Sequence, residues 1–251
     1  MAGKNRQLRR GLEQELRFLT EIGADFIFAP DKKGVPAPAY QPTEGKRTGD
    51  AGATVRAVRM KDPEKHRILA ALEEKILNCT LCPLSGGRTN AVPGEGDYSA
   101  ELMFVGEGPG FDEDIQGRPF VGRAGQLLTR IITAMNFKRE NVYITNVVKC
   151  RPPQNRTPLR EEIEKCRPYL LEQIATISPR VIVSLGKVAT DFFHPSPAGM
   201  SSRRGSFIEF GSILVMPTFH PSYLLRNEGN KEIKRLVWQD MQKVMDALGR
   251  K

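Results

Sequence analysis

Hydrophobic positions along the chain fall into two alternating kinds of segment. Short continuous apolar runs lie at 101–106, 142–148, 181–185 and 213–217. Stretches with apolar residues at helical spacing lie at about 68–77, 123–136, 160–177, 186–193 and 231–248. Buried runs alternating with amphipathic helices are typical of a parallel sheet covered on both faces. We therefore predict an α/β fold whose ligand crevice lies beyond the carboxyl ends of the strands.

The first part of the chain has a different pattern. Four leucines at helical spacing predict one short amphipathic helix there: Leu8, Leu12, Leu16 and Leu19. Residues 29–62 are rich in Pro, Gly and charge and have no sustained periodicity, which is typical of a linker. We expect a basic N-terminal extension with one helix and a linker over 1–69, followed by a folded domain over 70–251.

The charge of the chain favours a polyanionic partner. The formal net charge is +9, and more than half of the excess lies in residues 1–70. Phosphate-rich DNA or RNA is the first candidate, although the extension also fits a merely solvated tail. No stretch approaches the ~20 apolar residues of a membrane span, and residues 1–10 lead into no apolar signal region. We expect a cytoplasmic protein that does not enter membranes.

A glycine-rich segment follows the first predicted strand. Its sequence, GEGPGFDED at 106–114, lets the backbone turn sharply and approach a ligand closely. It is not a dinucleotide-binding fingerprint, because Phe111 stands where the third glycine belongs, and no Gly-Lys-Ser/Thr follows as in a P-loop. The alternative is an ordinary strand–helix turn.

Polar residues also end the second and fourth predicted strands. Asn146 offers an amide that reads the edge of a pyrimidine, and His220 is a candidate to stabilise negative charge on a leaving group. After the tight turn at Pro221 and Ser222, Leu224 and Leu225 fit an apolar wedge inserted into a base stack. The alternatives are an asparagine that satisfies a turn and leucines that belong to the core.

Four cysteines predict a metal site: Cys79, Cys82, Cys150 and Cys166. In a cytosolic chain, a C-x-x-C pair with two further cysteines points to a metal before disulfides. Four thiolates hold either tetrahedral Zn²⁺ or a [4Fe–4S] cluster. Only one pair is close in sequence, which favours a cluster over zinc, and free cysteines that share the chain by chance are a third interpretation.

Five motifs then occur in order: C-x-x-C at 79–82, GEGPGFDED at 106–114, GRPFVGRAGQLL at 117–128, TNVVKCRPPQNRTP at 145–158 and HPSYLLR at 220–226. Together with Cys166 they resemble the family-4 uracil-DNA glycosylases, the iron–sulfur members of the uracil-DNA glycosylase superfamily. The resemblance covers about 70–248. It implies a three-layer αβα fold with a central four-stranded parallel sheet, and a [4Fe–4S] cluster held by the four cysteines.

The resemblance also implies roles for individual residues. Phe120 stacks on a flipped uracil, Asn146 hydrogen-bonds its O4 and N3–H edge, and His220 faces O2. Residues implicated in catalysis are Glu107, Gly108, Glu113, Asn155 and His220. Residues of the loop that contacts DNA are Pro221, Ser222, Leu224 and Arg226, with Leu224 at the intercalating position.

One position departs from the best-known branch of the superfamily. Gly108, which also lines the implied uracil pocket, stands where that branch has an aspartate that positions water. Glu113, Asn155 or backbone carbonyls are the candidates to hold water instead. The loop at 151–158 contains no histidine, unlike a related branch that traps uracil sites covalently, so we expect turnover.

The sequence thus predicts a monomeric repair enzyme that flips uracil out of single- or double-stranded DNA. It hydrolyses the N-glycosidic bond, releases free uracil and leaves an abasic site. Within the motifs the only lysine is Lys149, beside a cysteine, so a Schiff-base lyase step is not indicated. The rival hypotheses are a non-catalytic iron–sulfur protein that binds damaged DNA and a cluster-bearing electron-transfer protein.

Overall fold

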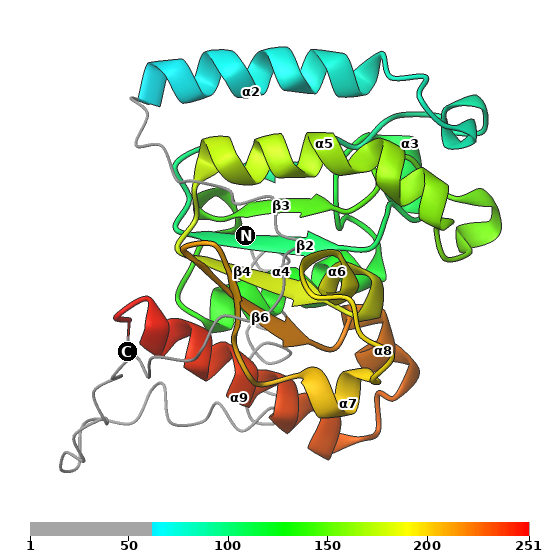
Figure 1. Ribbon diagram of the computed structural model, residues 1–251. Helices are drawn as coiled ribbons and strands as arrows, with labels where there is room; N and C mark the ends of the chain where they lie inside the picture. Colours follow the sequence, from blue (N-terminus) through cyan, green and yellow to red (C-terminus); the bar gives the residue numbers. More distant parts are fainter. Residues whose placement is uncertain (1–61, 251) are drawn as a thin grey trace, which may run out of the picture.

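The computed structural model describes residues 62–250 as an α/β fold built on one sheet of six strands (Figure 1). The strands lie in the order β1-β3-β2-β4-β6-β5. Their bounds are β1 Glu95–Gly96, β2 Leu102–Gly106, β3 Tyr143–Asn146, β4 Val181–Leu185, β5 Ile208–Phe210 and β6 Ile213–Thr218. The predicted α/β class is confirmed. The predicted N-terminal helix and the linker up to residue 61 lie outside the described residues.

The sheet is mixed. Neighbours among β3, β2, β4 and β6 pair in parallel, while β1 and β5 add antiparallel edges to β3 and β6. The sheet is therefore wider than the four-stranded parallel sheet that we expected. The edge strands are two and three residues long, which is too short for an alternating pattern to appear in the sequence.

Helices cover both faces of the sheet. Their bounds are α2 Asp62–Leu77, α3 Phe111–Gln116, α4 Arg123–Ala134, α5 Arg160–Ile177, α6 Lys187–Phe193, α7 Met200–Arg203, α8 Pro221–Arg226 and α9 Lys231–Ala247. Successive side chains of a strand point to opposite faces. Leu102 and Phe104 of β2 accordingly join a core with α4, α8 and α9, whereas Met103 and Val105 join one with α2, α5 and α6.

The five predicted helical stretches are confirmed as α2, α4, α5, α6 and α9. Helix α2 begins at Asp62 and continues past residue 70. Its Leu69 is buried, and its Lys65 donates a hydrogen bond to the carbonyl of Ile177 at 3.0 Å. This helix therefore packs on the folded domain along most of its length. The predicted strand at 142–148 is shorter in the structure and covers Tyr143–Asn146, although the N–H of Val147 still donates to the carbonyl of Gly106 at 2.9 Å.

The carboxyl ends of the four parallel strands meet at one edge of the sheet (Figure 1). The segments that follow them bring α3, the 3-10 turn η4 (Pro153–Asn155), α6 and α8 to this edge. No helix within 62–250 is long and apolar enough to cross a membrane. The edge is where the ligand crevice was predicted.

Candidate active site

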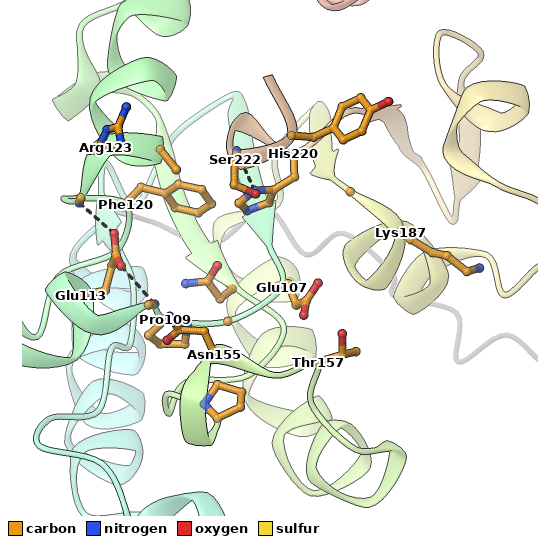
Figure 2. A pocket seen from close by; sticks show the side chains of 18 of the residues that line it. Glu107, Pro109, Glu113, Phe120, Arg123, Asn155, Thr157, Lys187, His220 and Ser222 are labelled. Carbon is orange, nitrogen blue, oxygen red and sulfur yellow. Dashed lines mark hydrogen bonds between the residues drawn. The ribbon is translucent and has the colours of Figure 1, made fainter. Parts of the chain in front are cut away.

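A cavity of about 860 Å³ opens at the carboxyl edge of the sheet (Figure 2). Segments following β2, β3, β4 and β6 all contribute to its wall. The residues predicted from the sequence that line it are Glu107, Gly108, Glu113, Phe120, Asn146, Asn155, His220, Ser222 and Arg226. Strand ends that are distant in sequence thus converge on one site.

Phe120 is held in the wall of this cavity by two glycines. Its side chain is 6% exposed, and its φ of 51° lies in the left-handed region, which is unfavourable for a bulky residue. A Cβ atom on Gly125 would lie 1.9 Å from the Phe120 carbonyl, and one on Gly106 would lie 2.5 Å from its ring. The ring occupies this place only because both positions are glycine.

Glu113 fastens the loop that carries Phe120. One carboxylate oxygen accepts hydrogen bonds from the backbone N–H groups of Val121 at 2.9 Å and Gly122 at 3.0 Å, and the other accepts one from Gly110 at 3.0 Å. Figure 2 shows the carboxylate between these two backbone segments. Three N–H donors thus occupy Glu113, so the residue is placed to position Phe120 and the glycine-rich turn rather than to hold water.

Asn146 ends β3 directly opposite Gly106 of β2. Its side chain is buried, and its Oδ1 accepts no hydrogen bond from any residue that the structure describes. A buried polar atom without a partner is costly in a finished fold. Because Asn146 lines the cavity, this oxygen is available to a ligand that brings a donor.

Lys149 fixes the backbone next to this asparagine. The lysine is 1% exposed, and its ammonium donates to the carbonyl of Asn146 at 2.8 Å, to Thr145 Oγ1 at 2.6 Å and to Gln173 Oε1 at 2.7 Å. Burial lowers its pKa to about 7, although the nearby Cys166 and Cys150 sulfurs oppose this change. The buried network ties the end of β3 to α5.

His220 presents a neutral imidazole to the cavity. The N–H of Ser222 donates to its Nδ1 at 3.1 Å, and the Ser222 hydroxyl lies 2.8 Å from the same nitrogen. Burial, together with the charge of Arg226, lowers the pKa of His220 to about 4. Since Nδ1 accepts, the proton of the neutral ring is on Nε2. The ring centroid lies 5.7 Å from that of Phe120 (Figure 2).

The opposite wall carries a carboxyl group and an amide. Burial raises the pKa of Glu107 above its usual value, while a hydrogen bond with Thr157 partly opposes this. Asn155 has a positive φ of 55°, and its Oδ1 accepts from Arg151 Nε at 2.7 Å. A Cβ atom on Gly108 would lie 2.7 Å from Val148 Cγ2, so the backbone here leaves no room for a side chain unless Val148 moves.

The structure places Leu224 in the core of the protein. The side chain is 2% exposed and belongs to the core that α4 and α8 share. In the protein without DNA it faces the interior, as the core alternative predicts, and its insertion into DNA stays a prediction. Pro221 is also buried and does not line the cavity. Ser222 lines the cavity and holds His220, and Arg226 lies exposed at the rim.

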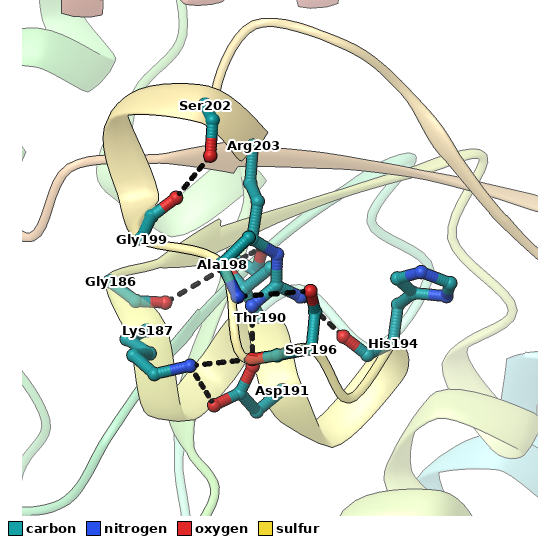
Figure 3. A network of polar contacts seen from close by, with 11 residues as sticks. Gly186, Lys187, Thr190, Asp191, His194, Ser196, Ala198, Gly199, Ser202 and Arg203 are labelled. Atoms are coloured by element: carbon teal, nitrogen blue, oxygen red, sulfur yellow. Dashed lines mark hydrogen bonds and ion pairs between the residues drawn. The ribbon is translucent and has the colours of Figure 1, made fainter.

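The segment after β4 contributes residues that sequence reasoning missed. Lys187 lines the cavity, and its ammonium donates to Asp191 Oδ2 at 2.9 Å and to the carbonyl of Ser196 at 2.8 Å (Figure 3). Arg203 is hydrogen-bonded to Asp191 and to the carbonyl of His194. These contacts fold α6 and α7 against the cavity rim. The position of Gly186 and Lys187 in the cavity wall could have been predicted, because both directly follow the predicted strand at 181–185.

The four cysteines come together in a second cavity, separate from the active site. All are free thiols, and all line one small cavity: Cys79, Cys82, Cys150 and Cys166. Arg88 Nη1 donates to Cys150 Sγ at 3.0 Å, and the N–H of Lys149 donates to Cys166 Sγ at 3.3 Å. Within 62–250, no three His, Cys, Asp or Glu side chains form a group that holds a metal ion. The donor set suits a sulfur-ligated group, with N–H donors directed at two sulfurs.

Comparison with known proteins agrees with this architecture. Residues 93–242 match the profile of the Uracil DNA glycosylase superfamily, and the chain belongs to this superfamily. A Type-4 uracil-DNA glycosylase of Thermotoga maritima is 50% identical over 181 residues, which cover 71% of this chain and 94% of the relative. One of Pyrobaculum aerophilum is 56% identical, covering 63% and 85%. A Type-5 enzyme of that organism is 28% identical, covering 65% and 86%. The predicted resemblance to family 4 is thus confirmed.

Proposed function

We propose that this protein excises uracil from DNA by hydrolysing the N-glycosidic bond. The observation that carries the proposal is the buried, unpartnered Oδ1 of Asn146, in a cavity that also holds the Phe120 ring and a neutral His220. The superfamily and the Type-4 relatives supply the substrate class. The enzyme acts in DNA repair and leaves an abasic site.

Base selection follows from the donor and acceptor pattern of uracil. Uracil has a donor at N3 beside an acceptor at O4, and the amide of Asn146 complements both through Oδ1 and Nδ2. Cytosine has an acceptor and a donor in the same places, which leaves the buried amide mismatched. Phe120 supplies the stacking surface. Because Lys149 and Gly106 fix the surroundings of Asn146, the amide is oriented before a base arrives.

Bond cleavage places negative charge on the departing uracil and positive charge on the sugar. The Nε2–H of neutral His220 is directed at O2 and stabilises the developing anion. Ser222 fixes the tautomer by donating to Nδ1. A fixed donor in a site shielded from water is more effective than solvent, because it needs no reorganisation during the reaction.

We assign to Glu107 the role of binding the attacking water and accepting its proton. Glu113 is occupied by three N–H donors and Asn155 Oδ1 by Arg151. Glu107 lines the cavity, and its raised pKa suits a residue that accepts a proton near its working pH. Gly108, the neighbouring residue, contributes a compact backbone turn rather than a side chain.

We further propose that the four cysteines hold a [4Fe–4S] cluster. Their thiols share one cavity, and four cysteine thiolates are the usual ligands of such a cluster. When bound, the cluster is a structural cross-link between the end of α2, the loop after β3 and α5. It braces the segment 151–158 beside the active site and takes no part in the chemistry.

DNA reaches the site along a rim of cations. Positively charged residues that line the cavity are Arg123, Arg156, Lys187 and Arg226. The charges of Arg123 and Arg226 suit the phosphates on either side of a flipped nucleotide, whereas Arg156 and Lys187 are ion-paired with Glu162 and Asp191. The basic extension over residues 1–69 adds charge for the same partner, and we propose that the protein acts as a monomer in the cytoplasm.

The test is release of free uracil from a uracil-containing oligonucleotide, in single-stranded form and opposite A or G, with thymine as the control base. We expect an alkali-labile abasic site from wild type. His220→Ala should lose most activity but keep DNA binding, and His194→Ala is the matched control because His194 is exposed outside the cavity. Uracil-DNA binding without base release by wild type would favour a non-catalytic damage-binding protein.

A further inference from the structure

One large apolar side chain lies exposed at the mouth of the active site. The apolar residues that remain largely exposed within 62–250 are Leu77, Leu81, Phe111, Ile115 and Leu159. Of these, only Phe111 also lines the cavity. Its side chain is 56% exposed at the first position of α3. An aromatic ring is therefore in contact with water where the DNA has to enter.

The ring of Phe111 is supported from the segment that follows β3. The guanidinium carbon of Arg151 lies 5.0 Å from the ring centroid, at the distance of a cation–π contact. Arg151 is itself oriented by Asn155 Oδ1 at 2.7 Å. This contact helps to fix the position of the ring at the cavity mouth, while more than half of its side chain stays accessible to a partner.

Flipping a nucleotide creates a need for such a surface. The bases beside the flipped uracil lose a stacking partner, and an apolar side chain of the enzyme commonly compensates for it. Leu224 is buried against α4 in the protein without DNA. Tyr223 also lines the cavity, but its ring packs on Phe219 with centroids 4.9 Å apart. Phe111 is the exposed aromatic that remains.

We propose that Phe111 stacks on the DNA base adjacent to the flipped uracil, with Arg151 as its positioning residue. The inference rests on the proposed function and adds a residue that contacts the strand outside the uracil pocket. Stacking between an aromatic side chain and a base tolerates any sequence, because every base has a π-face. The proposal therefore predicts a contact that depends on the ring and is independent of the neighbouring base.

The experiment uses an oligonucleotide that carries 2-aminopurine next to a 2′-fluorinated uracil nucleotide, whose glycosidic bond resists cleavage. In the wild-type complex, stacking on Phe111 should keep 2-aminopurine emission quenched. Phe111→Ala should brighten the emission and weaken binding about tenfold, as expected for one lost stacking contact. Phe111→Trp should restore both, and inhibition by free uracil should not change. Ile115→Ala is the matched control, since Ile115 is exposed on the same helix but outside the cavity.

The role of Arg151 is tested by a double-mutant cycle. Arg151→Met should brighten the emission in the same direction, and its effect should largely disappear when Phe111 is already alanine. The proposal is overturned if Phe111→Ala has wild-type emission and affinity, or if Tyr223→Ala alone causes the change. Either result leaves uracil release by wild type intact, whereas failure of that release refutes the proposed function itself.

Discussion

Gly106 and Asn146 lie side by side in parallel register, and a Cβ atom on Gly106 would stand 2.4 Å from Asn146 Oδ1. The same Cβ atom would lie 2.5 Å from the ring of Phe120. The two side chains proposed to bind the base thus both depend on the absence of one methyl group. The proposed recognition of uracil therefore depends on the pairing of β2 with β3.

Gly106→Ala should therefore impair catalysis more than folding. The added methyl group pushes Asn146 and Phe120 away from the base, and a displacement of about 1 Å commonly lowers rates about 100-fold. The measurement is kcat/KM for uracil release, with circular dichroism to verify the fold. Gly229→Ala is the control, because nothing lies within 4 Å of a Cβ atom there. Wild-type kcat/KM in Gly106→Ala would contradict this view of the pocket.

The activity should show no loss from protonation of His220 near pH 6.5, the ordinary pKa of histidine. Its pKa of about 4 keeps the imidazole neutral well below that pH. Between pH 6.5 and 4 the unfolded chain binds the proton and the folded one does not, so this group lowers stability as pH falls through that window. Nitrogen NMR of labelled histidine should give a neutral Nε2–H tautomer at pH 6. A cationic ring at that pH would refute the assignment.

Glu113→Gln should disturb both stability and rate. An amide has one acceptor oxygen where the carboxylate has two, so at least one of the N–H groups of Gly110, Val121 and Gly122 loses its partner. Hydrogen bonds to a charged group are worth about 1.5–3 kcal/mol each, and we expect a loss of about 2 kcal/mol in urea unfolding. The rate of uracil release should fall about tenfold through the displaced Phe120 loop. Glu172→Gln, on an exposed position of α5, should leave both quantities unchanged.

Cys166→Ser should remove the proposed cluster. We expect wild-type protein to be brown, with absorbance near 400 nm and bound iron and sulfide, and the variant to lose these together with several degrees of Tm. Ser85→Ala is the control, because Ser85 lines the same cavity without a thiol. A colourless wild-type protein that contains zinc would overturn the cluster assignment.

Much of this arrangement could be predicted because buried strands appear in the sequence as continuous apolar runs. The strands that begin at Leu102, Val181 and Ile213 are continuous apolar runs, and the rule that ligands bind beyond their carboxyl ends located Asn146 and His220. The edge strands β1 and β5 were missed because two or three residues carry no period. A sequence pattern cannot predict a strand that is this short and whose pairing partner is distant in the chain.

Side-chain direction was the harder quantity to predict. Leu224 and Leu225 are adjacent in an apolar pair, and no spacing rule tells which faces the core before the position of α4 is known. Glu113 has the same difficulty, because two of its three N–H partners, Val121 and Gly122, belong to a loop that returns only in the folded state. In the sequence Phe111 is only an interruption of a glycine pattern, because its exposure beside Arg151 is set by the tertiary structure.

The spacing of the cysteines has a consequence for biosynthesis. Cys79 and Cys82 precede β2, whereas Cys150 and Cys166 follow β3, so the four sulfurs meet only after these strands have paired and α2 has packed on α5. If the cysteines hold the proposed cluster, its iron and sulfide would be delivered to a nearly finished chain rather than to a nascent one. Insertion of the proposed cluster would then act as a checkpoint: a molecule that carries it would already have assembled the sheet that forms its active site.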